Sequence, residues 1–331
     1  MYDIKEIAKK LLIRDCIELS NAIFYISEKD RLVFMLASTP YICLVANEAY
    51  EWCRKAKISL TTFESKEHLE NIRAKAKLFG NDTIVSFNEQ RLMIESIIRT
   101  EHAYYKKLAK SYCPDFLIDD VGTYMLNNTY IGNTIQYAYD FHLFSKPNKS
   151  IYDSGDEIKS FSSEIGSMLR EIITILSGTS YRIPQGANIS QLHINRDFNF
   201  KRKFKQIDSI LIFSLACRIN FLLHCLKKNC PQDSMLYLRL IYITFYSSRN
   251  ELQNLKIDCD HIFDGYFNRV FRNCMAHYSL CQKVADNEIK PTTTGYGVIE
   301  KFFEVDYIEL VNTIESKLTL ILSALEMHYK S

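Results

Sequence analysis

The stretch that decides the fold is the apolar run IDSILIFSLACRINFLLHCL at residues 207–226. It is the only segment of the chain whose length comes near that of a membrane-spanning helix. It also contains Asp208, Arg218, Asn220 and His224, and such polar side chains are costly inside a bilayer. We therefore expect a buried helix of a helical bundle here, and no association with a membrane.

The composition of the whole chain also favours helices. Of its 331 residues, 47% are hydrophobic and 13% aromatic, enough for a substantial core in one large or two modest domains. The chain has ten Gly and six Pro, too few for a barrel or sandwich with many tight turns. We expect an all-α fold with one short β-hairpin near the C-terminal end.

Apolar spacing and capping signals place the expected elements. Capping boxes at Thr61 with Glu64 and at Ser86 with Glu89 predict helix starts near residues 62 and 87. Further helices are expected at residues 3–26, 30–57, 115–144, 156–176, 204–229, 232–252, 260–284 and 305–329. A loop is expected at 178–200 and the β-hairpin at 292–303, with its turn at Gly295-Tyr296-Gly297.

The best candidate for a linker is SKPNKSIYDSGD at residues 145–156, where Pro, Gly, Asn and Ser concentrate. It divides the chain into an N-terminal helical domain at residues 1–145 and a helical bundle at 156–331. We expect the N-terminal domain to sense a trigger or to hold a partner.

Charge and cysteine content bound the cellular setting. The formal net charge of +2 gives no global attraction to nucleic acid, so RNA affinity must come from local patches. Ten cysteines contain no CxxC pair, which favours reduced thiols in a cytosol. Residues 1–6 lack the basic and then apolar layout of a signal peptide. We expect a cytoplasmic protein.

The pattern with the clearest chemical content is FRNCMAHY at residues 271–278. Asn273 follows Arg272 directly, and four residues separate Arg272 from His277. Arginine is always charged and histidine titrates near neutral pH, so the pair supplies the two groups that metal-free cleavage of a phosphodiester requires. These three residues are the candidate catalytic residues of a ribonuclease.

A similar spacing occurs in Arg218 and His224, which have five residues between them. Both lie in the apolar run 207–226, and the residue after the arginine is apolar Ile219. We interpret this second pair as structural, with Arg218 extending its charged end to solvent and His224 in the core or an interface.

The Arg272 motif, followed by a Gly-, Pro- and Thr-marked turn region and a last amphipathic helix, resembles the HEPN family of small helical bundles. The motif of that family is Arg, four to six residues and then His, usually with a polar residue after the Arg. The resemblance covers about residues 204–331. It implies a metal-independent endoribonuclease that needs no cofactor, forms a homodimer and serves in toxin–antitoxin or anti-phage systems.

The resemblance also implies roles for single residues. Arg272 would stabilise the phosphate, Asn273 would position the arginine or the RNA, and His277 would transfer protons. An antitoxin or an activating partner would control the activity. Some family toxins carry a Tyr two residues after the His as a target for inactivating nucleotidylation. Here Ser279 holds that place and Tyr278 follows the His directly, so this mode of control does not carry over.

Helix geometry limits how the motif can act. Residues five positions apart on a regular helix lie about 140° apart around its axis. Arg272 and His277 therefore reach one phosphate only through a long arginine, a distorted helix or a second subunit. In a dimer, two motifs meet and two histidines provide the acid and the base. The expected products carry 2′,3′-cyclic phosphate and 5′-hydroxyl ends.

A second segment, HINRDFNFKRKFK at residues 193–205, bears on RNA binding. Its cations suit phosphates and its rings suit stacking on unpaired bases. An equal alternative is a solvated loop whose Phe side chains anchor it to the bundle. The candidate RNA-binding residues are Arg196, Phe198, Phe200, Lys201, Arg202, Lys203, Lys205 and Arg269. Arg269 lies one helical turn before Arg272, and its alternative is an ion pair with Asp264 or Glu304.

No metal site is expected. The acidic residues Glu48, Glu51, Glu95 and Glu101, with His102, lack the Glu-x-x-His pairs of di-iron bundles, and we interpret them as solvated helix faces. Cys274 precedes His277 without further ligands nearby, so it is assigned to packing. No phosphate-cradling Gly-rich loop, Gly-x-Ser-x-Gly elbow or His-Glu-x-x-His motif occurs.

Four other interpretations stay open. In the first, Arg272 and Asn273 cap or pair within the bundle while His277 is a satisfied core residue. In the second, the chain carries a catalytically inactive domain that resembles the HEPN family and serves only in RNA binding or dimerisation. In the third, the chain is a non-catalytic helical scaffold that binds a protein or RNA partner. In the fourth, it is a regulatory nucleotide-binding bundle.

Overall fold

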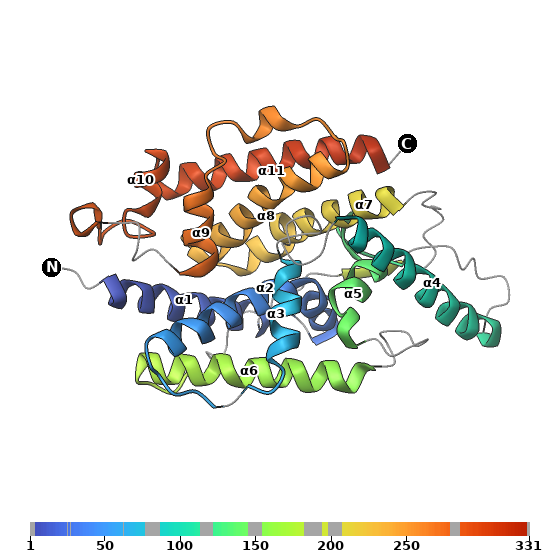
Figure 1. Cartoon of the computed structure of the whole chain (residues 1–331), viewed down its shortest axis with the longest axis horizontal. Helices are drawn as coiled ribbons and strands as arrows, with labels where there is room; N and C mark the ends of the chain where they lie inside the picture. Colours follow the sequence, from blue (N-terminus) through green and yellow to red (C-terminus); the bar gives the residue numbers. More distant parts are fainter. Residues whose placement is uncertain are drawn as a thin grey trace.

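The structure is a computed structural model, mostly helical with one small antiparallel sheet (Figure 1). It describes residues 4–24, 26, 28–61, 63–76, 87–112, 122–144, 154–181, 194–197, 207–278 and 285–329. The expected helical character is confirmed. The place of the strands differs from the prediction.

The first half of the chain contains four helices whose positions agree in the main with the predicted ones. They are α1 (Ile4–Phe24), α2 (Glu28–Lys55), α3 (Lys66–Lys75) and α4 (Phe87–Tyr112). The predicted start near residue 62 is wrong, because Thr61 does not cap α3. Its backbone N–H and its hydroxyl both donate to Glu171 Oε1, each at 2.9 Å, and so bind this loop to α6 (Gly155–Ser177). The capping box at Ser86 lies outside the described residues.

The sheet occupies part of the region where a helix was expected at 115–144. Strand β1 (Thr123–Leu126) pairs with β2 (Thr129–Asn133) through Asn127 and Asn128, both in the left-handed region at φ 49° and 65°. Two such residues form a tight hairpin turn, and asparagine tolerates this conformation better than most residues. The helical prediction is therefore wrong across this hairpin, and the helix α5 (Thr134–Asp140) begins only after it.

A third strand completes the sheet. Strand β3 (Ile194–Asp197) pairs antiparallel with the other side of β1, which gives the order β2-β1-β3. It lies inside the segment predicted as a loop at 178–200, so that prediction is wrong for these four residues.

The apolar run at 207–226 forms a buried helix, as expected. Helix α7 (Ile207–Asn220) continues into a π-helical segment (Phe221–Leu226) and a 3-10 turn (Lys227–Asn229). Arg218 does not extend to solvent: it is 2% exposed, pairs with Asp140, and donates to the carbonyl oxygen of Lys75 at 2.7 Å. His224 is exposed and so is not a core residue of this chain.

Among the residues that the structure describes, two helical segments are long and apolar enough to cross a membrane, judged by length and composition. They are Ile207–Asn229 and Asp30–Lys55, and in each 83% of the most apolar window is buried within the molecule. The run at 207–226 is therefore not the only segment of that length. Core helices of soluble proteins meet the same test.

The last third of the chain carries α8 (Met235–Asn254), α9 (Arg269–His277), α10 (Val298–Phe303) and α11 (Tyr307–Tyr329), with 3-10 turns at Asp260–Phe263 and Asp286–Glu288. The helix predicted at 260–284 is thus divided. The hairpin predicted at 292–303 is wrong, because turns lead directly into α10. Gly297, at φ 90°, is required there: a Cβ would lie 2.4 Å from the carbonyl oxygen of Glu288.

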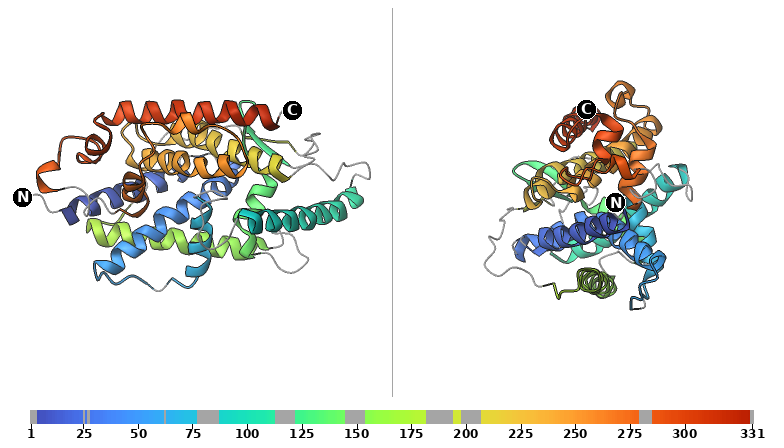
Figure 2. Two further views of the ribbon diagram at one scale, coloured as in Figure 1. Left: turned by 45° about the horizontal axis from the view of Figure 1, so that its top comes forward. Right: turned by 90° about the vertical axis from the view of Figure 1, so that its left-hand side faces the viewer.

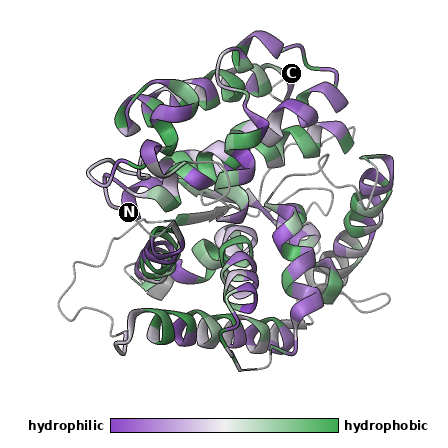
Figure 3. Ribbon diagram, turned by 60° about the vertical axis from the view of Figure 1, so that its left-hand side comes forward, coloured by the Kyte–Doolittle hydropathy of each residue, from purple (hydrophilic) through white to green (hydrophobic). Residues whose placement is uncertain are grey.

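The helices stack in layers that cross the predicted boundary at residue 145. Helix α6 packs on α1 and α2, α1 packs on α8, and α7 and α8 pack on α11 (Figures 1 and 2). Helix α6 belongs to the second predicted domain but packs on two helices of the first, because it has an apolar face to bury. Its buried side chains recur at helical spacing from Phe161 to Leu176, and Figure 3 shows apolar and polar bands alternating along it. One continuous core joins both parts of the chain. The two-domain division stays a prediction.

Acid is expected to destabilise this core through His142, which follows α5. Burial and the nearby charge of Lys75 lower the pKa of His142 from its usual 6.5 to about 4, although its Nδ1 lies 3.0 Å from the carbonyl oxygen of Tyr139. The folded protein therefore holds a neutral ring that takes up a proton on unfolding, so stability is lost as the pH falls below 6.5 towards 4.

We expect urea unfolding at pH 5 to give a free energy about 1–2 kcal/mol lower than at pH 7 from His142 alone. The variant His142→Gln, whose amide can still donate to Tyr139, should lack this increment. An equal pH dependence in both proteins would contradict the assignment to His142.

Candidate active site on helix α9

Helix α9 begins where Asn268 caps it. The Asn268 Oδ1 accepts from the backbone N–H groups of Val270 at 2.9 Å and Phe271 at 3.0 Å. Phe271, Cys274 and Met275 are fully buried and anchor one side of the helix. The cysteine therefore has the packing role expected of it. The predicted catalytic residues are less buried: Arg272 and Asn273 are partly exposed and the His277 side chain is 39% exposed.

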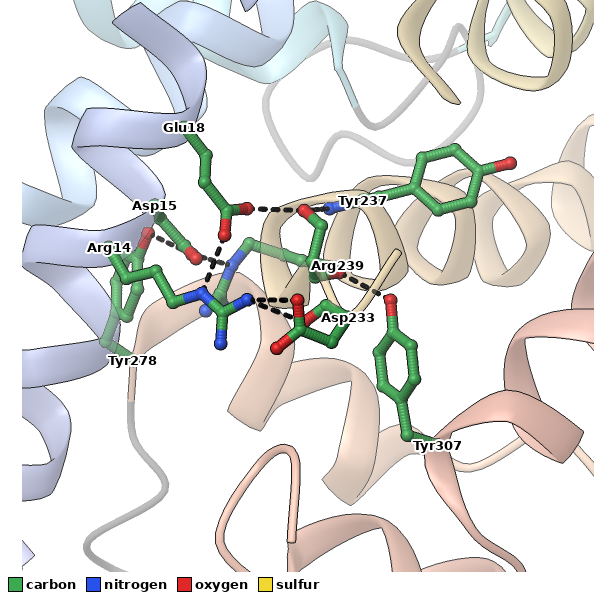
Figure 4. Close-up of polar contacts among 9 residues, drawn as sticks. Arg14, Asp15, Glu18, Asp233, Tyr237, Arg239, Tyr278 and Tyr307 are labelled. Carbon is green, nitrogen blue, oxygen red and sulfur yellow. Dashed lines mark hydrogen bonds and ion pairs between the residues drawn. The ribbon is translucent and has the colours of Figure 1, made fainter. Parts of the chain in front are cut away.

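Helix α9 ends at His277 because Tyr278 adopts the left-handed conformation, at φ 47°. A buried network fixes this end of the helix (Figure 4). The Tyr278 hydroxyl donates to Asp15 Oδ2 at 2.7 Å, and Arg239 Nε donates to the same oxygen at 2.8 Å. The Arg239 guanidinium also donates to the carbonyl oxygen of Met275 and lies 4.0 Å from the centroid of the Tyr278 ring. Asp15 on α1 therefore helps to hold the helix that carries His277.

A second group of contacts nearby joins α1 to α8 and α11. Glu18 accepts from the hydroxyl of Ser234, whose oxygen in turn caps α8 by accepting from the Tyr237 N–H at 3.0 Å. Arg14 pairs with Glu18 at 2.6 Å, and the Tyr307 hydroxyl donates to the carbonyl oxygen of Ser234 at 2.8 Å. Figure 4 shows these groups side by side between the three helices.

His277 contacts the first half of the chain. Its Nδ1 lies 3.1 Å from Glu48 Oε2 on α2. The Glu48 side chain is 8% exposed, and its other oxygen lies 2.6 Å from Arg73 Nη2 on α3 and 3.3 Å from Asn47 Nδ2. Burial alone would raise the pKa of Glu48, but the hydrogen bonds from His277 and Arg73 outweigh it and lower that pKa. The carboxylate is therefore ionised at neutral pH.

The interpretation of the acidic residues as solvated helix faces is wrong for two of them. Glu48 and Glu101 are buried, whereas Glu51 is partly exposed and pairs with Arg54 at 2.7 Å. A carboxylate can be buried when cations or donors replace water, and Arg73 and His277 do this for Glu48. No group of three or more metal-ligating side chains comes together among the residues that the structure describes.

Arg272 contacts a different helix. Its guanidinium carbon lies 5.0 Å from the centroid of the Tyr246 ring on α8. Tyr246 in turn stacks on Phe267, with the ring centroids 4.1 Å apart and the planes at 5°. The Nε of Arg272 has no hydrogen-bond partner within the described ranges. The charged end of Arg272 is thus supported by an aromatic ring, with no carboxylate to neutralise it among the described residues.

The structure does not join Arg272 to His277. One side chain lies over α8 and the other reaches α2, and no hydrogen bond links them in the part of the chain that the structure covers. Asn273 lies between them on the partly exposed side. Arg269 is exposed at the first position of α9, and neither of the ion pairs considered for it, with Asp264 or Glu304, is seen.

The predicted RNA-binding segment is only partly described. Arg196 lies in strand β3, opposite Tyr124 of β1. The remaining predicted residues of this segment lie outside the described residues: Phe198, Phe200, Lys201, Arg202, Lys203 and Lys205. Their role in RNA binding stays a prediction.

Comparison with known proteins gives no further guide to the chemistry. No protein-family model, no curated protein and no solved structure matches the chain.

Proposed function

We propose that the chain is a metal-independent endoribonuclease of HEPN type, with Arg272 and His277 as its catalytic groups and Asn273 as an assisting polar group. One observation supports this most. Helix α9 carries a guanidinium that is supported by an aromatic ring and an imidazole that is held by a buried carboxylate, and neither Arg272 nor His277 is buried. A core histidine would be buried instead.

The proposed reaction uses the 2′-hydroxyl of RNA as its nucleophile. A histidine removes the proton from this hydroxyl, and the oxygen attacks the adjacent phosphorus. The negative charge that develops on the phosphate is met by the forked guanidinium of Arg272. The bond to the 5′-oxygen breaks, this oxygen takes a proton, and the products carry 2′,3′-cyclic phosphate and 5′-hydroxyl ends.

A homodimer is part of the proposal. Because Arg272 and His277 contact different helices of one chain, a second copy offers the simplest route to bring both groups to one phosphate. Two copies would also supply separate histidines as acid and base. We place the enzyme in the cytoplasm as a toxin or anti-phage effector controlled by an antitoxin or an activator.

The second candidate is a non-catalytic scaffold that binds a protein or RNA partner. One observation favours it: Arg272 and His277 both have contacts within their own chain, to Tyr246 and Glu48. Residues that only stabilise a helix would also be held in this way.

Cleavage of RNA in excess EDTA distinguishes the two candidates. We expect purified protein to cut mixed RNA under these conditions and to leave 2′,3′-cyclic phosphate and 5′-hydroxyl ends, identified by their resistance or sensitivity to end-specific enzymes. Products with 5′-phosphates, or cleavage that EDTA stops, would contradict the proposed mechanism. Intact RNA, even after separation from co-purifying partners, would favour the scaffold.

A further inference from the structure

The contact between Glu48 and His277 has a direction that follows from hydrogen-bond chemistry. An ionised carboxylate accepts hydrogen bonds and donates none. With Glu48 Oε2 at 3.1 Å from Nδ1, the neutral ring of His277 must carry its hydrogen on Nδ1. The other nitrogen, Nε2, then has a free lone pair.

The Glu48 carboxylate is held firmly in the position from which it accepts the hydrogen bond of His277. It lies on α2 between Asn47 and Ala49, both buried, and its second oxygen is held by the donor-only guanidinium of Arg73 at 2.6 Å. Three elements of the chain thus meet at one histidine: α2 with Glu48, α3 with Arg73 and α9 with His277 itself.

Among the described residues, the charged groups near His277 lie on α2, α3, α8 and α9 itself. Glu48 from α2 is the hydrogen-bonded counter-charge, and Arg73 from α3 lies behind it. Arg239 from α8 lies beneath the end of α9, where it binds the carbonyl oxygen of Met275 and the buried Asp15. Arg272 and Arg269 are the cations of α9. Of these groups, Glu48 is the hydrogen-bond acceptor that contacts the ring.

We infer that Glu48 is a positioning residue of the site: it holds His277 in the Nδ1–H tautomer and thereby presents Nε2 as the proton-accepting nitrogen. Its part in catalysis rests on the proposed ribonuclease function. The tautomer itself does not. The N-terminal part of the chain then supplies a member of the site, in addition to any part it has in sensing or partner binding.

The variant Glu48→Gln tests this inference with little change in shape. Arg73 can only donate, so it selects the amide oxygen of Gln, and the amide NH₂ is left facing His277. An NH₂ group donates to Nδ1, which requires the hydrogen of the ring to move to Nε2. We therefore expect the substitution to reverse the tautomer of His277.

The measurement is the ¹⁵N NMR spectrum of the full chain labelled at histidine, above the pH at which its histidines are protonated. His277→Gln identifies the His277 signals by their loss. We expect Nδ1–H in the wild type and Nε2–H in Glu48→Gln. Glu51→Gln, on the same helix but paired with Arg54 and Lys66, is the matched control and should keep Nδ1–H.

Wild-type His277 in the Nε2–H form, or a tautomer unchanged in folded Glu48→Gln, would overturn the inference. If Glu48→Gln does not fold, the wild-type spectrum alone decides. In the cleavage assay we expect kcat to fall about 10–100-fold in Glu48→Gln with little change in KM, because Glu48 orients the histidine and does not touch RNA. A wild type that cuts no RNA but shows the Nδ1–H form would reject the ribonuclease and leave the tautomer assignment standing.

Discussion

The variant Asp15→Ala is expected to lose about 3–5 kcal/mol of unfolding free energy, because it leaves a buried guanidinium without its counter-ion. Asp15 and Arg239 are 0% and 1% exposed, and one carboxylate oxygen of Asp15 accepts from both Arg239 and Tyr278. Denaturant unfolding of the two proteins at neutral pH measures the difference. The substitution should also loosen the C-terminal end of α9, because Tyr278 donates to Asp15 and the Met275 carbonyl oxygen accepts from Arg239.

Two further variants test whether the loss of unfolding free energy comes from the buried Asp15–Arg239 pair and not from removal of any nearby carboxylate. Asp233→Ala removes a carboxylate that pairs with Arg14 at 2.8 Å but is 59% exposed, and it should cost less than about 1 kcal/mol. The double variant Asp15→Leu with Arg239→Met replaces the whole pair by apolar groups and should be much more stable than Asp15→Ala. A cost for Asp15→Ala no larger than that for Asp233→Ala would contradict the argument.

Elements with strong local patterns could be predicted from the sequence. Helices α1, α2, α6, α8 and α11 were expected near their observed positions because apolar side chains recur at helical spacing within each of them. The β1–β2 hairpin was missed. Its signal was present in the paired Asn127 and Asn128 between two short runs that each begin with Thr-Tyr, but the flanking helical patterns outweighed it.

The candidate site also has a part that could be predicted from the sequence and a part that could not. The motif on α9 is local and could be found by spacing, whereas its partner Glu48 lies 229 positions away along the chain. Nothing in the sequence states which distant residues meet. One sign of the buried network was available: Arg239 is a lone cation in the apolar run at 235–246, and a charge in such a run requires a partner. The sequence does not say that this partner is Asp15.

Replacing either predicted catalytic residue is expected to reduce RNA cleavage by about 10²–10⁴-fold. His277→Ala removes the proton-transfer group, and Arg272→Ala removes the charge that meets the phosphate. Arg272→Lys should recover little, because a lysine cannot reproduce the forked contact. Single-turnover rates with a labelled RNA measure the loss, and circular dichroism checks that each variant is folded.

Arg249→Ala is the matched control for Arg272→Ala. Arg249 lies 4.6 Å from the centroid of the Phe267 ring, so it is also supported by an aromatic ring in the same stack, but it forms an ion pair with Asp260 at 3.0 Å. Its removal should leave cleavage within about twofold of the wild type, since exposed pairs contribute little. Equal losses in both arginine variants would indicate a packing role for the stack and would count against Arg272 as a catalytic group.

Mixing the two inactive variants then tests how the groups combine. If one site takes Arg272 from one subunit and His277 from the other, a dimer of Arg272→Ala with His277→Ala contains one intact site. Random exchange of subunits makes half of the dimers mixed, so about a quarter of the wild-type activity should return if one histidine per site is enough, whereas a site that uses both histidines as acid and base should stay inactive. No return of activity would mean that each site needs two histidines or both groups of one chain. In the second case Arg272 would have to leave Tyr246 and turn towards His277, because in this structure the two side chains lie against different helices.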